Sequence, residues 1–261
     1  MSKKTEIETR VIAPMQSVGR CGKSTLVQAL IEFLNYGEVE KAVIDADGEH
    51  KTLSAWFPKV AHMPFVKSQD WLPILNHCGS CPVEIIDFPA QATDELLAGL
   101  KQFKADEIFA GKKVKLTIPI FASDERTAMA SAAKIVQATN SYADYLLILS
   151  PARYTSETFL ASEKLMELIG DVPRITLPAI TEVTLGEIDK ASKQQKKSLT
   201  FSEALGHIPI ASKMEMETWL NGVMLEMEEA ISLLLPDPKL MKNQFKRTKA
   251  KAIEEIDQFD L

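Results

Sequence analysis

Short apolar segments alternate along the chain with longer segments whose apolar residues recur at helical spacing. The first kind is typical of buried β-strands and the second of amphipathic helices. Strands are predicted at Arg10–Met15, Lys41–Asp45, Met63–Val66, Val83–Phe88, Lys115–Phe121, Tyr145–Ser150 and Arg174–Leu177. The clearest helices are predicted at Leu26–Leu34, Ala92–Phe103, Arg126–Thr139, Glu157–Leu168 and Glu215–Leu234. This alternation predicts an α/β fold, with a mostly parallel, twisted sheet and helices on both faces.

Length and two prolines determine the predicted domain organisation. The chain has 261 residues, enough for one large α/β domain. Pro236 and Pro238 end the last predicted helix, because proline lacks an N–H and its ring obstructs the preceding turn. We therefore predict one domain over residues 1–235 and a C-terminal helical tail over residues 236–261, first basic and then acidic.

Composition excludes several classes of protein. Hydrophobic residues make up 46% of the chain, yet no apolar run approaches the ~20 residues that cross a bilayer. The first residues carry charges with no apolar segment after them, so no signal peptide is predicted. Three cysteines, an odd number, argue against a disulfide framework. We expect a cytoplasmic protein without a membrane span, associated with the nucleoid if it binds DNA.

One short stretch carries most of the recognisable chemistry. Ser17–Thr25 reads Ser-Val-Gly-Arg-Cys-Gly-Lys-Ser-Thr and lies between a predicted strand and a predicted helix. That context is typical of a phosphate-binding P-loop, in which backbone N–H groups at a helix N-terminus surround an anion. In such a loop Lys23 reaches the β- and γ-phosphates, and the Ser24 hydroxyl binds Mg²⁺. Although Ser17 replaces the first glycine of the standard pattern, we predict that the chain binds a nucleoside triphosphate.

Two carboxylate motifs lie at the ends of predicted strands, where a sheet of this kind places its ligand. Asp45 and Asp47 follow one strand, and Asp87 ends another. An apolar strand that ends in aspartate has the form of a Walker B element, whose carboxylate holds the Mg²⁺ shell beside the P-loop serine. Aspartate also ends many strands by forming a local turn, so each motif alone indicates little. Together, downstream of a P-loop, they predict a Mg²⁺ site.

These residues resemble the ParA/MinD-type ATPases with a deviant Walker A motif, which partition plasmids, chromosomes and other cargo. The resemblance extends over residues 9–234. The family's phosphate-binding loop falls on Val18–Ser24. Its Asp-x-Asp switch falls on Asp45 and Asp47, and its Walker B strand, Ile-Ile-Asp-x-Pro, falls on Ile85–Pro89.

The resemblance implies a role for each matching residue. Lys23 and Asp47 would be catalytic, the first by neutralising phosphate charge and the second by orienting the attacking water. Ser24, Asp45 and Asp87 would hold Mg²⁺. The nucleotide would be bound by the loop and by the segment after the last strand, that is, by Val18, Gly19, Arg20, Cys21, Gly22, Lys23, Ser24, Thr25 and Pro178. The implied activity is a Mg²⁺-dependent ATPase with weak turnover, and no base-reading motif separates ATP from GTP.

The family's signature lysine is missing from this chain, which has Val18 in its place. In the family that lysine reaches across a homodimer to the phosphate of the partner's nucleotide. Arg20 is a nearby cation, although its spacing does not show where it points. The resemblance still implies ATP-dependent dimerisation and an adaptor or centromere-binding protein as partner. The missing lysine weakens the prediction of hydrolysis more than the resemblance itself.

Cys78 and Cys81 form a Cys-x-x-Cys motif with His77 beside it. A zinc site needs four ligands, and the sequence offers no second motif of that kind. A thioredoxin-like motif would open a helix after a strand, whereas this one precedes a strand. A loop with two unreactive thiols is therefore favoured over redox sensing or metal binding. For Cys21, the helix N-terminus and the neighbouring Lys23 predict a lowered thiol pKa.

Two basic clusters are candidates for a DNA contact on a protein whose net charge is −6. One comprises Lys190, Lys193, Lys196 and Lys197. The other is the tail from Lys239 to Lys251, where helical spacing would align Lys239, Lys242, Lys246 and Lys249. Lysine runs are usually solvated surfaces, but the resemblance implies non-specific DNA binding through basic residues in the last third of the chain.

Three classes of function are consistent with these features. The favoured one is a ParA-like partition or stability ATPase, whose nucleotide state controls dimerisation and attachment to DNA or a partner. The second is a nucleotide-binding scaffold with little hydrolysis, because of Val18. The third is a P-loop kinase or synthetase of small molecules, which needs a substrate lid formed by Gly48–Gln69 or Gln102–Lys115.

Overall fold

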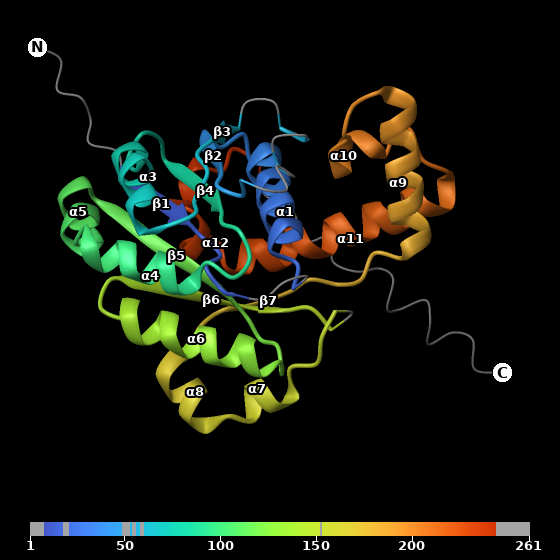
Figure 1. The fold of residues 1–261 in the computed structure, drawn as a ribbon. Coiled ribbons are helices and arrows are strands. Elements are labelled where there is room, and N and C mark those ends of the chain that lie inside the picture. Colours follow the sequence, from blue (N-terminus) through green and yellow to red (C-terminus); the bar gives the residue numbers. More distant parts are fainter. Residues whose placement is uncertain are drawn as a thin grey trace, which may run out of the picture.

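A seven-stranded, wholly parallel sheet forms the centre of the molecule (Figure 1). The computed structural model describes residues 8–17, 21–48, 53, 56–57, 60–151 and 153–243. The strand order is β3-β2-β4-β1-β5-β6-β7. The strands are β1 (Thr9–Ile12), β2 (Lys41–Asp45), β3 (Ala61–His62), β4 (Val83–Asp87), β5 (Val114–Phe121), β6 (Ala143–Leu149) and β7 (Arg174–Thr176).

One face of the sheet packs against the helix that follows β1. This face is covered by α1 (Lys23–Tyr36), α9 (Glu182–Gln195), α10 (Phe201–Ala204), α11 (Ile210–Glu229) and α12 (Ile231–Leu234). The helix α11 runs between α1 and α9 and contacts both (Figure 1). Apolar side chains of these helices, such as Leu30 and Val223, share a core with Ile85 and Ile148 of the sheet.

The opposite face packs against helices from the middle of the chain. They are α3 (Trp71–His77), α4 (Thr93–Gln102), α5 (Ala105–Lys112), α6 (Arg126–Thr139), α7 (Glu157–Ala161) and α8 (Glu163–Ile169). Side chains such as Trp71 and Ile135 form a second core there with Ile86 of the sheet. Successive strand residues point to opposite faces, so Ile85 and Ile86 belong to different cores. The predicted α/β fold, with a parallel sheet covered on both faces, is confirmed.

Two predicted helices are interrupted. The segment Glu157–Leu168 contains α7 and α8, which are separated at Ser162, where the backbone is extended (φ −75°, ψ 91°). The segment Glu215–Leu234 contains most of α11 and then α12, and α11 begins earlier, at Ile210. In both cases the apolar spacing continues across the break, because both pieces pack on the same face of the sheet.

The prediction of a strand at Met63–Val66 is wrong. The edge strand β3 is Ala61–His62 and pairs with only two residues of β2, Ile44 and Asp45. The sequence pattern also does not predict α3, α5, α9 and α10. Within the described residues, no helix combines the length and the apolar character that a membrane span requires.

The chain after the last helix packs against the end of α1. Pro238–Leu240 forms one 3₁₀ turn, labelled η2, and Met241 is buried. The N–H of Lys242 donates to the carbonyl of Gly37 at 3.0 Å. The first two lysines of the predicted tail helix therefore lie outside any α-helix, and residues 244–261 of that tail lie outside the described residues.

Candidate functional site

The P-loop stretch connects a strand to a helix, as its sequence requires. β1 ends at Ile12 and α1 begins at Lys23, and residues 18–20 between them lie outside the described part of the chain. Gly22 precedes the helix with φ 100° and ψ 17°, a left-handed conformation that residues with a Cβ rarely adopt. Among the described residues no side chain caps the helix at Gly22, and the positive end of the helix dipole favours an anion there.

Lys23 is buried at the start of α1, with 8% of its surface exposed. Its Nζ donates to the Gln16 carbonyl at 3.0 Å, so the side chain folds back over the loop. Burial lowers the pKa of Lys23, while Cys21 and Asp87 partly oppose that shift by favouring the charged form. A buried ammonium gains more from an anionic partner than from a neutral carbonyl, so the position suits a phosphate.

Ser24 and Asp87 meet because α1 follows β1, and β1 is the neighbour of the strand that ends at Asp87. β4 pairs directly with β1, and the Ser24 Oγ donates to Asp87 Oδ2 at 3.2 Å. Burial raises the pKa of Asp87 to about 7, Asp45 adds to that increase, and the Ser24 hydrogen bond opposes it. A cation at this point would hold the carboxylate ionised. The serine hydroxyl and buried carboxylate are oxygen ligands of the kind that Mg²⁺ uses beside substrate phosphates.

Asp45 and Asp47 lie next to this pair. Asp45 is buried and stands in register with Asp87, on the neighbouring strand β2. Its Oδ1 accepts a hydrogen bond from the Asp47 N–H at 3.2 Å, and Asp47 itself is half-buried. The structure thus brings Lys23, Ser24 and the three aspartates to one edge of the sheet. The role of each in binding or catalysis stays a prediction.

Two polar residues that the sequence analysis did not select hold the start of the loop. The buried amide of Gln16 donates to the carbonyls of Phe121 and Ala128 and accepts from the Phe121 N–H at 2.7 Å. The Ser17 hydroxyl donates to Thr93 Oγ1 at 2.6 Å. Ser17 therefore joins the loop to α4. The sequence feature that could have indicated this role is the polar pair Gln16-Ser17 directly after an apolar segment.

A cavity of about 230 Å³ opens beside the N-terminal end of α1. Its lining includes Thr25 of α1 together with Pro178 and Trp219. The Trp219 Nε1 donates to the Pro178 carbonyl at 2.9 Å, which fixes the segment after β7 against α11. The lining mixes apolar and aromatic side chains with polar ones, Glu182 among them. The binding of a nucleobase by the segment that contains Pro178 stays a prediction.

The expected acidity of Cys21 is wrong. The thiol is buried, with 2% exposure, and burial raises its pKa. Lys23 and Arg153 lower the pKa, but their effect is smaller than that of desolvation. Cys21 is therefore a packed side chain under the loop and is not an activated nucleophile.

The thiols of Cys78 and Cys81 are also free and buried, in the loop between α3 and β4. Burial raises the pKa of both, that of Cys81 to about 11. Among the described residues, no group of three or more histidine, cysteine or acidic side chains is arranged to hold a metal ion. These observations favour the interpretation of a structural loop.

The lysines at 190–197 lie on α9 and just after it. Three of them form surface ion pairs, at N–O distances of 3.3, 2.5 and 2.7 Å, and the pairs are Lys190–Glu187, Lys193–Asp189 and Lys197–Glu203. Such exposed pairs contribute little stability. They do reduce the local positive charge, so this surface is less basic than the lysine spacing indicates.

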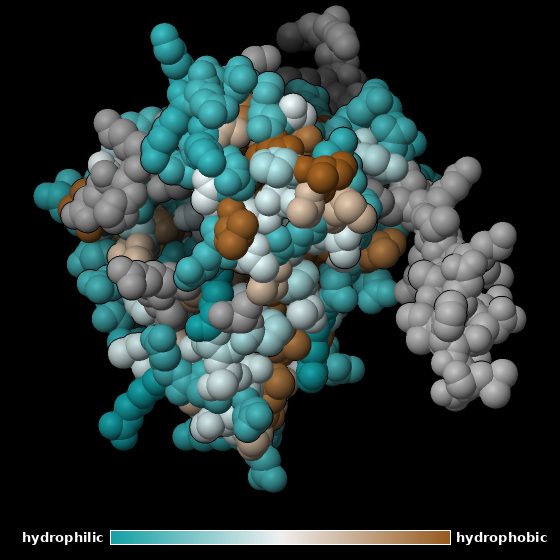
Figure 2. Space-filling view, turned by 90° about the vertical axis from the view of Figure 1, so that its right-hand side faces the viewer, coloured by the Kyte–Doolittle hydropathy of each residue, from teal (hydrophilic) through white to brown (hydrophobic). Residues whose placement is uncertain are grey.

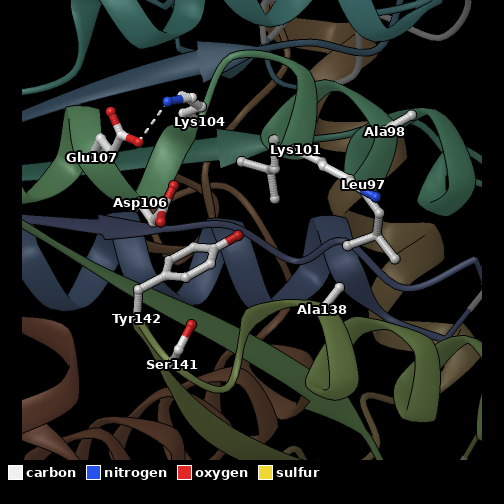
Figure 3. Close-up of a pocket in the computed structure, with 10 residues that line it drawn as sticks. Leu97, Ala98, Lys101, Lys104, Asp106, Glu107, Ala138, Ser141 and Tyr142 are labelled. Atoms are coloured by element: carbon white, nitrogen blue, oxygen red, sulfur yellow. Dashed lines mark hydrogen bonds and ion pairs between the residues drawn. The ribbon is translucent and has the colours of Figure 1, made fainter.

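A larger hollow of about 570 Å³ lies between α4, α5 and the end of α6 (Figure 3). Tyr142 and Ser141 precede β6, which places the hollow at the amino-terminal edge of the sheet, opposite Asp87. Its charged residues include the ion pair Lys104–Glu107 at 2.9 Å. None of the residues that line it belongs to the predicted nucleotide site.

No family model matches the chain, and no curated protein matches it. Two solved structures of similar architecture are the MinD cell division protein of Aquifex aeolicus, at 12% identity and a TM-score of 0.47, and the MinC:MinD cell division protein complex of the same organism, at 11% and 0.48. Each alignment covers 86% of this chain and 96% of the other. Similarity at this level carries no argument about function, which has to come from the site itself.

Proposed function

We propose that the chain binds a nucleoside triphosphate with Mg²⁺ and hydrolyses it slowly, as a nucleotide-controlled switch. The observation that carries this proposal is the 3.2 Å contact between Ser24 and Asp87 at the N-terminus of α1, with Lys23 buried beside it. Helix N–H groups, a fixed cation and a serine–carboxylate pair are the parts that phosphoryl transfer requires from a protein.

Each group in the site has one task. The first N–H groups of α1 and the Lys23 ammonium bind phosphate oxygens and neutralise their charge. Ser24 and Asp87 would hold Mg²⁺, with Asp45 behind them, and the ion would supply positive charge that offsets the charge of the phosphates. Asp47 is the least buried of the three aspartates, so we assign to it the orientation of the attacking water.

At the next level of detail, we place the chain among ParA-like ATPases that act in plasmid partition or stability. The support is the order and spacing of the loop, the Asp-x-Asp pair and the strand that ends at Asp87. On this reading ATP favours a homodimer. Exposed apolar residues on α9 and α11, among them Val183, Ile210 and Met214, offer contact surface. Figure 2 shows the side of the molecule on which α9 lies in Figure 1, where apolar and polar residues are interspersed.

A small-molecule kinase is the weaker alternative. One of its two candidate lids, Gln102–Lys115, contains α5 and enters β5 at the amino-terminal edge of the sheet, opposite the P-loop. A segment at that edge cannot close over Lys23. A nucleotide-binding scaffold remains the second candidate, since Val18 offers no cation for hydrolysis.

Titration of the protein with a fluorescent ATP analogue, with and without Mg²⁺, tests the proposal. We expect Lys23→Ala to abolish binding and Asp87→Asn to remove the part of the affinity that depends on Mg²⁺, about tenfold or more. The matched control is Asp171→Asn, an exposed carboxylate in the turn before β7. Wild-type affinity in Lys23→Ala would refute the assignment of the P-loop.

Size-exclusion chromatography and phosphate release separate the three functional classes. A switch ATPase doubles in mass with ATP and Mg²⁺ and releases phosphate slowly. A scaffold binds ATP without phosphate release, and a metabolite kinase keeps its mass and requires a second substrate. An unchanged mass in ATP would contradict the ParA-like part of the proposal and leave nucleotide binding intact.

A further inference from the structure

Arg153 lies over the start of α1, although the two are far apart in sequence. It follows β6, where its N–H donates to the Ser150 carbonyl at 2.9 Å and forms a tight turn. A Cβ built on Gly22 would lie 3.5 Å from Arg153 Cδ and 3.6 Å from Nε, so the side chain passes in contact distance over the last residue of the loop. Its Nη2 donates to Thr25 Oγ1 at 3.4 Å.

Arg153 is exposed and adds positive charge at the start of α1. The N-terminus of α1 carries a positive partial charge, and no acidic residue lies in its first turn. Lys23 adds a second cation. Within the described part of the chain, no carboxylate lies at ion-pair distance from Arg153, whose side-chain partner is the neutral Thr25 hydroxyl. An anion bound between Arg153, Lys23 and the helix N-terminus would be attracted by all three.

The position of Arg153 relative to the cavity indicates which part of a nucleotide it meets. Arg153 and Thr25 line the same cavity as Trp219, and Glu182 lines it as well. A nucleotide with its base beside Trp219 and its terminal phosphates at Lys23 would have its α-phosphate between the two. That is where the guanidinium lies.

We propose that Arg153 binds the α-phosphate of the nucleotide and supplies a cation within the same subunit, in a chain that has valine at position 18. The inference rests on the proposed function, because it needs a nucleotide in the P-loop. A guanidinium can donate two parallel hydrogen bonds to phosphate oxygens, which a lysine ammonium does not match. Arg153 would thus set affinity for every phosphorylated form of the nucleoside, with no role in the hydrolytic step.

Equilibrium binding of ATP, ADP, AMP and adenosine to Arg153→Gln tests this, with Trp219 fluorescence and competition as readouts. Since the α-phosphate is common to the three nucleotides, we expect about tenfold weaker binding of each and unchanged binding of adenosine. Arg153→Lys should recover only part of the loss. The matched control is Arg174→Gln, which removes the same charge from an exposed position at the start of β7, the opposite edge of the sheet.

The outcomes distinguish this inference from the function on which it rests. If the wild type binds none of the nucleotides, the proposed function fails. If the wild type binds them and Arg153→Gln binds them equally well, only the role of Arg153 is wrong. A loss restricted to ATP would move the contact to the γ-phosphate, and an equal loss for adenosine would mean that Arg153 only shapes the cavity. Either of these results overturns the α-phosphate assignment.

Discussion

Asp47 and Asp87 lie in the same cluster, but their surroundings differ. Asp87 is buried and accepts a hydrogen bond from Ser24, whereas Asp47 is half-buried at the outer side of the cluster. Asp47→Ala should therefore leave ATP affinity within about twofold of the wild type and lower hydrolysis by about 100-fold. Titration and single-turnover phosphate release on the same protein measure the two effects separately.

Asp47→Asn is the matched control for that experiment, since it keeps the shape of the side chain and removes its charge. If water orientation needs the carboxylate, Asp47→Asn behaves like the alanine variant. Loss of Mg²⁺-dependent affinity in Asp47→Ala, equal to that in Asp87→Asn, would mean that Asp47 belongs to the metal shell and that the roles are assigned incorrectly.

Local motifs explain which site residues could be predicted from the sequence. Lys23 and Ser24 are recognisable because a P-loop needs them at fixed spacing, and Asp87 because it ends an apolar strand. Arg153 has no such signal. It meets Thr25 only because the end of β6 and the start of α1 lie near each other in space, although the two residues are 128 positions apart in the chain. The raised pKa of Cys21 was missed for a related reason, since the packing that buries its thiol is not visible in the loop sequence.

At the scale of elements, α9 is attached to the body of the molecule through a carboxylate on α11. Glu215 accepts hydrogen bonds from the Thr181 N–H at 2.7 Å, the Thr181 hydroxyl at 2.8 Å and the Thr184 hydroxyl at 2.5 Å. Thr181 in turn caps the helix by accepting from the Thr184 N–H. This contact joins α9, which lines the cavity through Leu185, to the long helix behind it.

Glu215→Ala should lower the free energy of unfolding by about 1 kcal/mol, a value reduced from that of a buried charged hydrogen bond because the site is exposed. The hydrogen bond from Thr184 lowers the pKa of Glu215 in the folded protein. The contribution is thus present above the unfolded pKa and is lost as pH falls through the lower, folded pKa. Urea unfolding at pH 7 and in acid measures this change.

Glu217→Ala is the control for Glu215→Ala. It lies on the same helix and is also exposed, but its partner is Lys213 at 3.8 Å, a weak surface pair. We expect little change in stability from it at either pH. If Glu215→Ala lowers the free energy of unfolding by the same amount at pH 7 and at acid pH, the packing of the Glu215 side chain stabilises the fold and its charge does not.

Helices stabilised by tertiary contacts were the hardest elements to predict. The sequence of α9 is mostly polar, and its buried residues are few, Thr184, Ile188 and Ala191. Its first turn depends on Thr181, whose hydroxyl donates to Glu215 of α11. Glu215 is distant in the sequence, so a pattern local to α9 does not include it. By contrast, α6 was predicted with its observed limits, because its buried residues recur regularly along one face.

At the scale of the whole molecule, the folded body continues past the last helix. Met241 is buried, and a Cβ on Gly37 would lie 2.1 Å from its Sδ, so the methionine fills the space that this glycine leaves. Lys242 also forms an ion pair with Glu38 at 3.1 Å. The boundary predicted at residue 235 stays a prediction, and truncated chains can test it.

A chain that ends at Asn243 keeps Met241 in place, whereas one that ends at Pro238 loses it. We expect the longer chain to unfold at the wild-type urea concentration and to bind ATP normally. The shorter one should lose about 2 kcal/mol, the value of one buried methionine side chain. Equal stability of the two would show that residues 239–243 add nothing to the fold.

The same two chains test the basic tail. Both lack Lys246, Arg247, Lys249 and Lys251, and only the shorter lacks Lys239 and Lys242 as well. If the tail binds DNA, removal of the residues after Asn243 should weaken DNA binding and flatten its dependence on salt. Binding releases about one counterion for each phosphate contact, so fewer contacts release fewer counterions. Gel shifts at several salt concentrations measure the slope. An unchanged affinity and slope would exclude the tail and leave the partly neutralised lysines of α9 as the remaining candidate.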